Sequence, residues 1–418
     1  MRVKNRGIAL AAEQNIEQEI GRVTLGDAIT SVSPLPYPVP DPDQKWDLPN
    51  GFAWVYYGEG SRGVSRPVIM ADGFNLGKSD LTVLYAGLDR DYPLITKLRK
   101  QGRTVILLGF QERTASIVTN AEAAKAAIRR TVDERSDGSQ LAVGGFSMGG
   151  LITRYALAEL ESEHMAHETA LYFSYDTPHR GGVIPIGIQA FAHFIPALPG
   201  QEQNDFAKQI NSPASRQMLY RHYNSADGTN RQDPMRTDFL QRLEALGGWP
   251  QGPRKIAVAN GTGNGTGVNV PPGQMALKST GATVFPGTTF YTQATGNGVT
   301  VAELKRLLPA ASKTVKTDDF PEFDGAPGGT LDSYGIIAKA LKEKGGTTDL
   351  RHPTVCFVPS VSAVAIRDIG NQDDLHVKIN GLDPEESELD EFLCSSTTTA
   401  HTEITAELCE WIMQRLPK

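Results

Sequence analysis

The hydrophobic positions of the chain gather in short, uninterrupted runs that alternate with longer amphipathic stretches. Apolar runs that predict strands lie at residues 52–57, 67–71, 104–109, 141–145, 171–175, 255–259 and 354–358. Most of these runs are apolar throughout, which is typical of strands buried on both faces. Helix-like segments lie at residues 80–101, 121–134 (after Asn120 as N-cap) and 150–160. Strands alternating with helices of this length predict an α/β fold with a mostly parallel, doubly wound sheet.

Two regions depart from this alternation. Residues 1–50 contain few periodic apolar runs and include a proline-rich stretch, so they predict an N-terminal extension. Residues 181–252 contain helical patches, of which 235–246 is the clearest, and they predict an inserted helical cap or lid. The expected core is therefore formed by residues 51–180 and 253–418.

Within the second half of that core, residues 261–298 are rich in Gly, Thr and Pro and predict loops with one hairpin, formed by 282–285 and 288–292. The repeated glycines from Gly261 to Gly267 superficially resemble a phosphate-binding loop. They are followed by Val268-Asn-Val-Pro-Pro272 instead of a helix, so no helix N-terminus is available to hold a phosphate.

Composition and charge exclude several classes of protein. The 418 residues include 41 Lys and Arg against 48 Asp and Glu, a formal charge of −7, and no basic stripe that would neutralise nucleic-acid phosphates. No apolar run approaches the ~18 residues of a membrane span, so no integral membrane contact is expected. The cysteines, Cys356, Cys394 and Cys409, lack metal-site spacing, so neither structural zinc nor a dithiol redox site is expected. Oligomeric state is left open.

The N-terminus begins with basic residues, but the apolar stretch from Ile8 to Ala12 is too short for a signal peptide and acidic residues follow it. We therefore expect a chain that starts near Met1 and stays in the reducing cytoplasm. Secretion after removal of a leader remains the alternative.

The chemistry is indicated by Gly145-Phe-Ser-Met-Gly149, which has the pattern G-x-S-x-G between a predicted strand and a predicted helix. This context is the one that a nucleophile elbow requires. Small residues two before and two after Ser147 let the chain turn tightly and project Oγ near the positive end of the following helix, where an oxyanion is favoured.

Four segments together resemble the α/β-hydrolase superfamily, and in particular its lipase and esterase members. They are Gly145–Gly149, Pro67-Val-Ile-Met-Ala-Asp-Gly-Phe-Asn75, Asp176-Thr-Pro-His-Arg-Gly181 and a histidine near the C-terminus. The resemblance implies a serine hydrolase that needs no metal or organic cofactor. It also implies an oxyanion hole made by the N–H of Met148 and that of Phe74 or Asn75. Most relatives have His-Gly at the latter loop, where this chain has Asp72-Gly73.

The chain order of the catalytic groups in such hydrolases, Ser then Asp or Glu then His, places the base late in the sequence. His401 lies just before a predicted C-terminal amphipathic helix (404–416) and is the preferred base. His376, in a polar stretch, is its rival. His179 is expected to pack and hydrogen-bond, and His352 is expected to begin the last strand.

In this superfamily the catalytic acid lies either in the loop after the strand that follows the nucleophile or in the loop after the next strand. The later loop, residues 260–267, contains no carboxylate. The earlier loop offers Asp176, which would accept the Nδ1–H of the catalytic histidine. Asp324 and Asp332 remain alternatives because the region between 182 and 350 resembles nothing that fixes their position, and Asp368 remains an alternative beside them.

These residues predict a hydrolase of small-molecule or lipid-like carboxylic esters that works through an acyl-serine. The apolar segment 183–199, interrupted by Pro and Gly, is either a core helix or a lid and acyl-binding wall. The second reading favours hydrophobic acyl or alcohol groups. Alternatives are an acyltransferase or cyclising thioesterase with the same triad, an amidase, or an inert binding module of the same fold.

Overall fold

The computed structural model describes residues 35–197, 200–281, 283–343 and 346–418. At its centre is an eight-stranded sheet with the strand order β1-β2-β4-β3-β5-β6-β9-β17. Neighbouring strands are parallel, except that β2 runs antiparallel to both β1 and β4. The strands are β1 (Gln44–Leu48), β2 (Gly51–Tyr56), β3 (Val68–Ala71), β4 (Val105–Phe110), β5 (Leu141–Phe146), β6 (Thr169–Tyr175), β9 (Arg254–Thr262) and β17 (Glu391–Ser395).

Helices cover both faces of this sheet, as the continuous apolar strands require. The helices are α2 (Leu81–Asp89), α3 (Leu94–Lys100) and α13 (Ala406–Met413) on one face, and α4 (Ile117–Glu134) and α5 (Met148–Ser162) on the other. Strand β3 shows the division: Val68 and Met70 pack with the first group, whereas Ile69 and Ala71 pack with the second. Successive side chains of a strand point to opposite faces, so every residue of β3 is buried.

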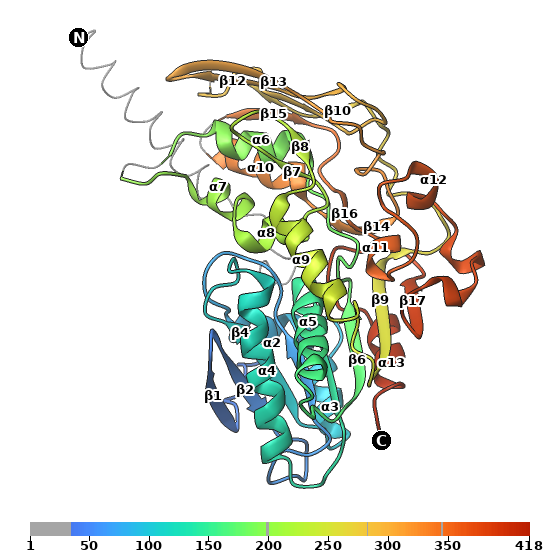
Figure 1. Ribbon diagram of the computed structural model, residues 1–418. Coiled ribbons are helices and arrows are strands. Elements are labelled where there is room, and N and C mark those ends of the chain that lie inside the picture. The colour runs from blue at the N-terminus through green and yellow to red at the C-terminus, as the bar shows by residue number, and fades with distance from the viewer. Residues whose placement is uncertain (1–34, 198–199, 282, 344–345) are drawn as a thin grey trace.

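A second group of elements lies above the sheet in Figure 1. It contains α6 (Ile186–Phe194), α7 (Asp205–Ile210), α8 (Pro213–Met218), β7 (His222–Tyr223), β8 (Asn230–Arg231), α9 (Pro234–Ala245) and α10 (Ser333–Glu343). Helix α6 is buried along almost its whole length. The predicted helix at 235–246 corresponds to α9.

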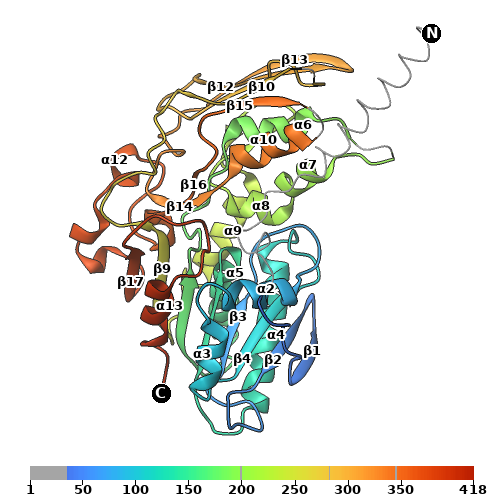
Figure 2. The ribbon, with the colours of Figure 1, turned by 180° about the vertical axis from the view of Figure 1, so that it is seen from behind.

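A separate five-stranded sheet forms the outermost layer over α6 and α10, as both views show (Figures 1 and 2). Its order is β13-β12-β11-β10-β15. The strands are β10 (Met275–Thr280), β11 (Thr289–Tyr291), β12 (Thr300–Leu307), β13 (Ala310–Lys316) and β15 (Thr347–Leu350). These strands belong to the range 253–418 that the sequence analysis assigns to the core, but none of them pairs with the central sheet.

The remaining short elements connect the two sheets. Strands β14 (Gly328–Leu331) and β16 (Val355–Pro359) form an antiparallel pair. The others are α11 (Ser360–Ala363), α12 (Gln372–Leu375), η2 (Ile379–Gly381) and η3 (Pro384–Glu386). Among the described residues, no helix has both the length and the apolar character that a bilayer crossing demands.

Several predicted elements differ from the structure. The run 354–358 forms β16, which pairs with β14 and not with the central sheet, whose last strand is β17. The predicted extension 1–50 contributes β1 to the sheet, while its residues 1–34 lie outside the described part. The predicted hairpin of 282–285 with 288–292 is wrong, because β11 pairs with β10 and β12.

Helix boundaries also differ from the sequence analysis. The predicted helix 80–101 is two helices, separated at Pro93, which lacks an N–H and precedes α3 as its N-cap. Helix α4 begins at Ile117 and not after Asn120, because the Ser116 hydroxyl accepts the N–H of Thr119 at 3.0 Å and caps the first turn.

Candidate functional site

Ser147 occupies a sharp turn between β5 and α5. Its backbone angles, φ 52° and ψ −125°, lie outside the regions that a side-chain-bearing residue prefers. The turn closes because its flanking positions carry no side chain. A Cβ added at Gly145 would lie 2.4 Å from the carbonyl carbon of Gly149, and one added at Gly149 would lie 2.4 Å from the oxygen of Ala71. The sequence G-x-S-x-G therefore has a steric cause in this structure.

His401 is brought to Ser147 by the loop between β17 and α13. Its Nε2 lies 2.8 Å from Ser147 Oγ. The backbone N–H of His401 donates to the oxygen of Thr330 at 2.7 Å, so β14 fixes the loop from the other side. The ring of Phe357 meets the imidazole edge-to-face, with centroids 4.7 Å apart. Packing and one backbone hydrogen bond thus orient the imidazole.

Asp176 follows β6 directly and adopts a positive φ of 47°. Its Oδ2 lies 2.7 Å from His401 Nδ1, while its Oδ1 accepts the backbone N–H of Asn260 at 3.0 Å. With Nδ1–H donated to this carboxylate, His401 Nε2 is free to accept the Ser147 proton. The side chains of Ser147, His401 and Asp176 are fully buried, which excludes water from the hydrogen-bond chain.

The other histidines lie elsewhere. His376 is the C-cap of α12 and its ring lies beside Gly267. The Nε2 of His179 lies 2.9 Å from Ser174 Oγ, and burial lowers the pKa of His179 well below its usual value. This contact suits the packing role expected of it. The backbone N–H of His352 donates to Ala276.

The Nδ1 of His401 is hydrogen-bonded to Asp176, and the three alternative acids have hydrogen-bond partners of their own. Asp324 is buried and accepts hydrogen bonds from the Gln293 N–H and the Tyr334 hydroxyl, both at 3.1 Å. Burial raises the pKa of Asp324 to about 6. Asp332 accepts from Thr354 at 3.4 Å, and Asp368 accepts from the N–H of Gly370.

The three residues predicted for the oxyanion hole lie at two places around Ser147. Met148 is the first residue of α5, so its N–H has no partner within the helix. Phe74 and Asn75 lie in the loop after β3, and both are buried. Within the described ranges, the N–H groups of Phe74 and Asn75 donate to no other residue. Both remain candidates for the second donor.

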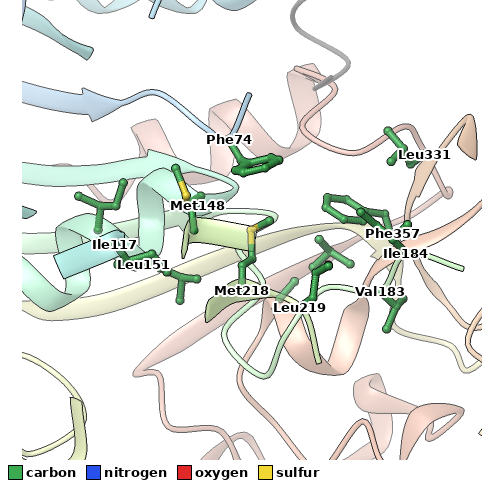
Figure 3. Close-up of a cluster of buried hydrophobic side chains, with 14 of the residues drawn as sticks. Phe74, Ile117, Met148, Leu151, Val183, Ile184, Met218, Leu219, Leu331 and Phe357 are labelled. Atoms are coloured by element: carbon green, nitrogen blue, oxygen red, sulfur yellow. The ribbon is translucent and has the colours of Figure 1, made fainter. Parts of the chain in front are cut away.

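Apolar side chains from both halves of the molecule meet in one cluster that includes Phe74 and Met148 (Figure 3). Phe74, Met148 and Leu151 come from the core, whereas Met218 and Leu219 come from α8 and the residue after it. Phe357, Ile184 and Leu331 lie on the other side of the cluster in Figure 3. Phe74 and Met148 therefore lie within an apolar cluster, and Phe357 of the same cluster packs on His401.

Four contributors to the site were not found in the sequence. Asn260 and Gly329 contact Asp176, whereas Thr330 and Phe357 contact His401. The only signal was the pair Gly328-Gly329, since adjacent glycines in a strand often mark a close approach of another chain segment. The contacts of the others depend on long-range packing.

The strand order decides the fold. A mostly parallel sheet with an antiparallel second strand carries a strained serine elbow after β5, and an acid and a histidine follow later strands. The chain has the α/β-hydrolase fold. The expected doubly wound sheet is confirmed.

Known proteins resemble the chain weakly. No family model matches it, and no curated protein matches its sequence. Among solved structures of the α/β-hydrolase fold, the mature Bacillus licheniformis lipase BlEst2 is 12% identical, with 50% of this chain and 72% of that one covered and a TM-score of 0.32. The carboxylesterase EstE1 from a metagenomic library is 13% identical, with 59% and 75% covered and a TM-score of 0.33. The Xanthomonas campestris serine hydrolase XC6422 is 17% identical, with 53% and 85% covered and a TM-score of 0.26.

Proposed function

We propose that the protein is a serine hydrolase that cleaves carboxylic esters through an acyl-serine intermediate. One observation carries the proposal: an unbroken hydrogen-bond chain from Ser147 Oγ to His401 Nε2 and from His401 Nδ1 to Asp176 Oδ2, at 2.8 and 2.7 Å. A serine at a strained elbow, a histidine that can take its proton and a buried carboxylate are the groups that acyl transfer requires.

In the first half of the reaction, Ser147 Oγ attacks the ester carbonyl carbon and its proton passes to His401 Nε2. Asp176 stabilises the resulting imidazolium through the Nδ1–H bond. The carbonyl oxygen becomes an oxyanion, which would accept the N–H of Met148 and that of Phe74 or Asn75. The carbon–oxygen bond to the alcohol then breaks, and His401 returns the proton to the leaving alcohol.

In the second half, a water molecule gives a proton to His401 Nε2 and attacks the acyl-serine. The tetrahedral intermediate collapses, the proton returns to Ser147 Oγ, and the carboxylic acid leaves. The balance requires only ester and water. No cofactor takes part in the proposed chemistry.

The apolar surroundings support esters with hydrophobic acyl or alcohol groups. Phe74 and Met218 are buried in one cluster with Met148, the residue that follows Ser147 in the chain. Moving an apolar chain from water into such a site is favourable by roughly 0.8 kcal/mol for each buried CH₂ group. We further propose that residues 181–252 act as a cap on the core, because α8 supplies part of this cluster.

The test is the intact mass of the protein after incubation with a fluorophosphonate, for wild type and Ser147→Ala side by side. We expect one adduct on the wild type and none on the variant. Hydrolysis of a series of esters with increasing acyl length should fall by about 10⁴-fold or more in kcat in the variant. An unlabelled, folded wild type that hydrolyses no ester would contradict the proposal. Products formed only with an added alcohol or amine would instead indicate acyl transfer.

A further inference from the structure

The loop that carries the candidate second oxyanion donor is held by the segment that follows β4. The N–H of Ser79 donates to the oxygen of Phe110, and the N–H of Phe110 donates to Ser79 Oγ, both at 2.9 Å. Nearer to Phe74, the N–H of Gly77 donates to Glu112 Oε1 at 3.1 Å. Residues 72–79 therefore depend on residues 110–114 for their shape.

Arg113 makes the central contacts between these two segments. Its guanidinium donates to the oxygens of Leu76 and Gly77, at 2.9 and 3.3 Å. Its Nη1 lies 3.6 Å from Oδ2 of Asp72, whose Oδ1 accepts the N–H of Gly73 at 2.8 Å. The same side chain thus holds the loop on both sides of Phe74 and Asn75.

The Arg113–Asp72 pair is an unusual choice for stability alone. Only 8% of Arg113 and 5% of Asp72 is exposed, and Oδ2 of Asp72 has no hydrogen-bond partner within the described ranges. Removing two charges from water costs several kcal/mol for each ion, which the attraction between them only partly offsets. The Arg113–Asp72 pair therefore contributes little to the stability of the fold. Its role is better explained by the shape that it gives to residues 72–79.

The segment after β4 also contacts α8, which belongs to the proposed cap. The N–H of Ala214 in α8 donates to the oxygen of Thr114 at 3.2 Å, and the N–H of Ile117 donates to Gln217 Oε1 at 2.7 Å. Residues 112–117 therefore touch the candidate oxyanion loop at one end and cap helix α8 at the other.

We propose that Arg113, together with Asp72, is a positioning residue that sets the second oxyanion donor, and that residues 112–117 link this donor to the position of α8. The inference rests on the proposed ester hydrolysis. An oxyanion donor must lie 2.7–3.1 Å from the developing charge, so a loop displaced by about 1 Å loses much of its effect. Arg113 fixes the loop before the substrate binds and contacts none of the reacting atoms.

The experiment measures kcat, KM and the inhibition constant of an alkylboronic acid, whose tetrahedral adduct on Ser147 places an oxygen in the oxyanion hole. The variants are Arg113→Met, Arg113→Lys, Asp72→Asn and the double variant Arg113→Met/Asp72→Asn. The matched control is Arg129→Met, which removes a half-exposed arginine of α4. Circular dichroism and thermal melting establish that each variant is folded.

For Arg113→Met we expect kcat to fall about 10- to 100-fold and the boronate inhibition constant to rise by a similar factor, with KM within about twofold. Arg113→Lys should recover part of the loss. The double variant should be no worse than Arg113→Met, because the amide oxygen at position 72 can still accept the N–H of Gly73 and the contact with Arg113 is already lost. Arg129→Met should match the wild type.

A folded Arg113→Met protein whose boronate inhibition constant stays within about threefold of wild type would overturn the inference. If Arg113→Met does not fold, the same criterion applied to Arg113→Lys and Asp72→Asn decides. Gln217→Leu tests the link between the second oxyanion donor and α8. This variant should raise the boronate inhibition constant, but less than Arg113→Met does. A change in KM alone would reject the link. A wild type that hydrolyses no ester and takes up no fluorophosphonate would refute the proposed function itself, a result distinct from all of these.

Discussion

Gly329 lies directly against the carboxylate of Asp176. A Cβ built on Gly329 would lie 2.0 Å from Oδ2 of Asp176, the oxygen that contacts His401. Strand β14 can lie this close to Asp176 only because this position has no side chain. The next residue, Thr330, accepts the backbone N–H of His401, so one strand borders the acid and holds the histidine loop.

Replacing Gly329 with Ala should therefore disable the site. The added methyl group must displace either the Asp176 carboxylate or β14, and each movement breaks the contact between Asp176 and His401. We expect kcat to fall by about 10²-fold or more, since misplacement by about 1 Å has this effect on catalytic groups. The measurement is kcat for a short-chain ester.

The control for this variant is Gly381→Ala. A Cβ at Gly381 meets no atom within 4 Å, so this variant should retain wild-type kcat and melting temperature. Full activity in Gly329→Ala would mean that Asp176 does not need its present position.

Asp176→Asn should lower kcat by about 10³- to 10⁴-fold while leaving the fold intact. The amide cannot stabilise an imidazolium as a carboxylate does, and its NH₂ group favours the wrong tautomer of His401. Fluorophosphonate labelling should slow in parallel. Asp368→Asn, on an exposed loop residue considered as an alternative acid, should label at the wild-type rate. The opposite ranking of the two variants would assign the acid to Asp368.

The buried carboxyl of Asp324 should make stability depend on pH. Its pKa in the folded protein is about 6, above its usual value of 3.8, so between these values the folded state binds a proton that the unfolded state releases. The free energy of unfolding should therefore fall as pH rises through 6. Between pH 4.5 and 7.5 the wild type should lose about 2 kcal/mol relative to Asp324→Asn.

Urea unfolding of both proteins at the two pH values measures this difference. Asp373→Asn, at an exposed position of α12, serves as the control and should follow the wild type. A constant difference between the wild type and Asp324→Asn would show that this carboxyl does not titrate in the interval.

Met218→Ala should change which esters are accepted. Met218 is the last residue of α8, only 1% of it is exposed, and it lies beside Met148 in Figure 3. Truncation leaves space in the apolar cluster that contains Met148, at a cost of about 2–5 kcal/mol in the free energy of unfolding. We expect kcat/KM for long acyl chains to rise relative to that for short ones. An unchanged chain-length profile would place the acyl group elsewhere.

Much of the fold could be predicted because the core strands are apolar throughout and the chain between them has helical periodicity. Strand β17, Glu391-Phe-Leu-Cys-Ser395, escaped prediction because it is short, polar at both ends and only partly buried. Its place in the sheet comes from parallel pairing with β9, a contact between segments far apart in the chain. The outer sheet escaped prediction for a related reason, since strands such as β13 are mostly exposed and polar.

Ser147 could be predicted from local sterics alone, because the residues two before and two after it, Gly145 and Gly149, must lack side chains for the turn to close. Predicting that His401 and Asp176 lie together required the family's chain order in addition to the residues themselves. No local pattern indicates that Asn260 donates to Asp176 or that Phe357 packs on His401. Those contacts arise only when β9, β16 and the histidine loop converge.

The proposed acid, Asp176, lies after β6, so the turn after β9 does not have to supply a catalytic group. That turn can serve as a point of attachment, and the outer five-stranded sheet is indeed built from chain that leaves β9 and returns at β17. The outer sheet could therefore become longer or shorter during evolution without changing β5, β6 and β17, the strands that Ser147, Asp176 and His401 follow. For the same reason, the outer sheet is a natural site at which to graft a new binding surface onto the protein.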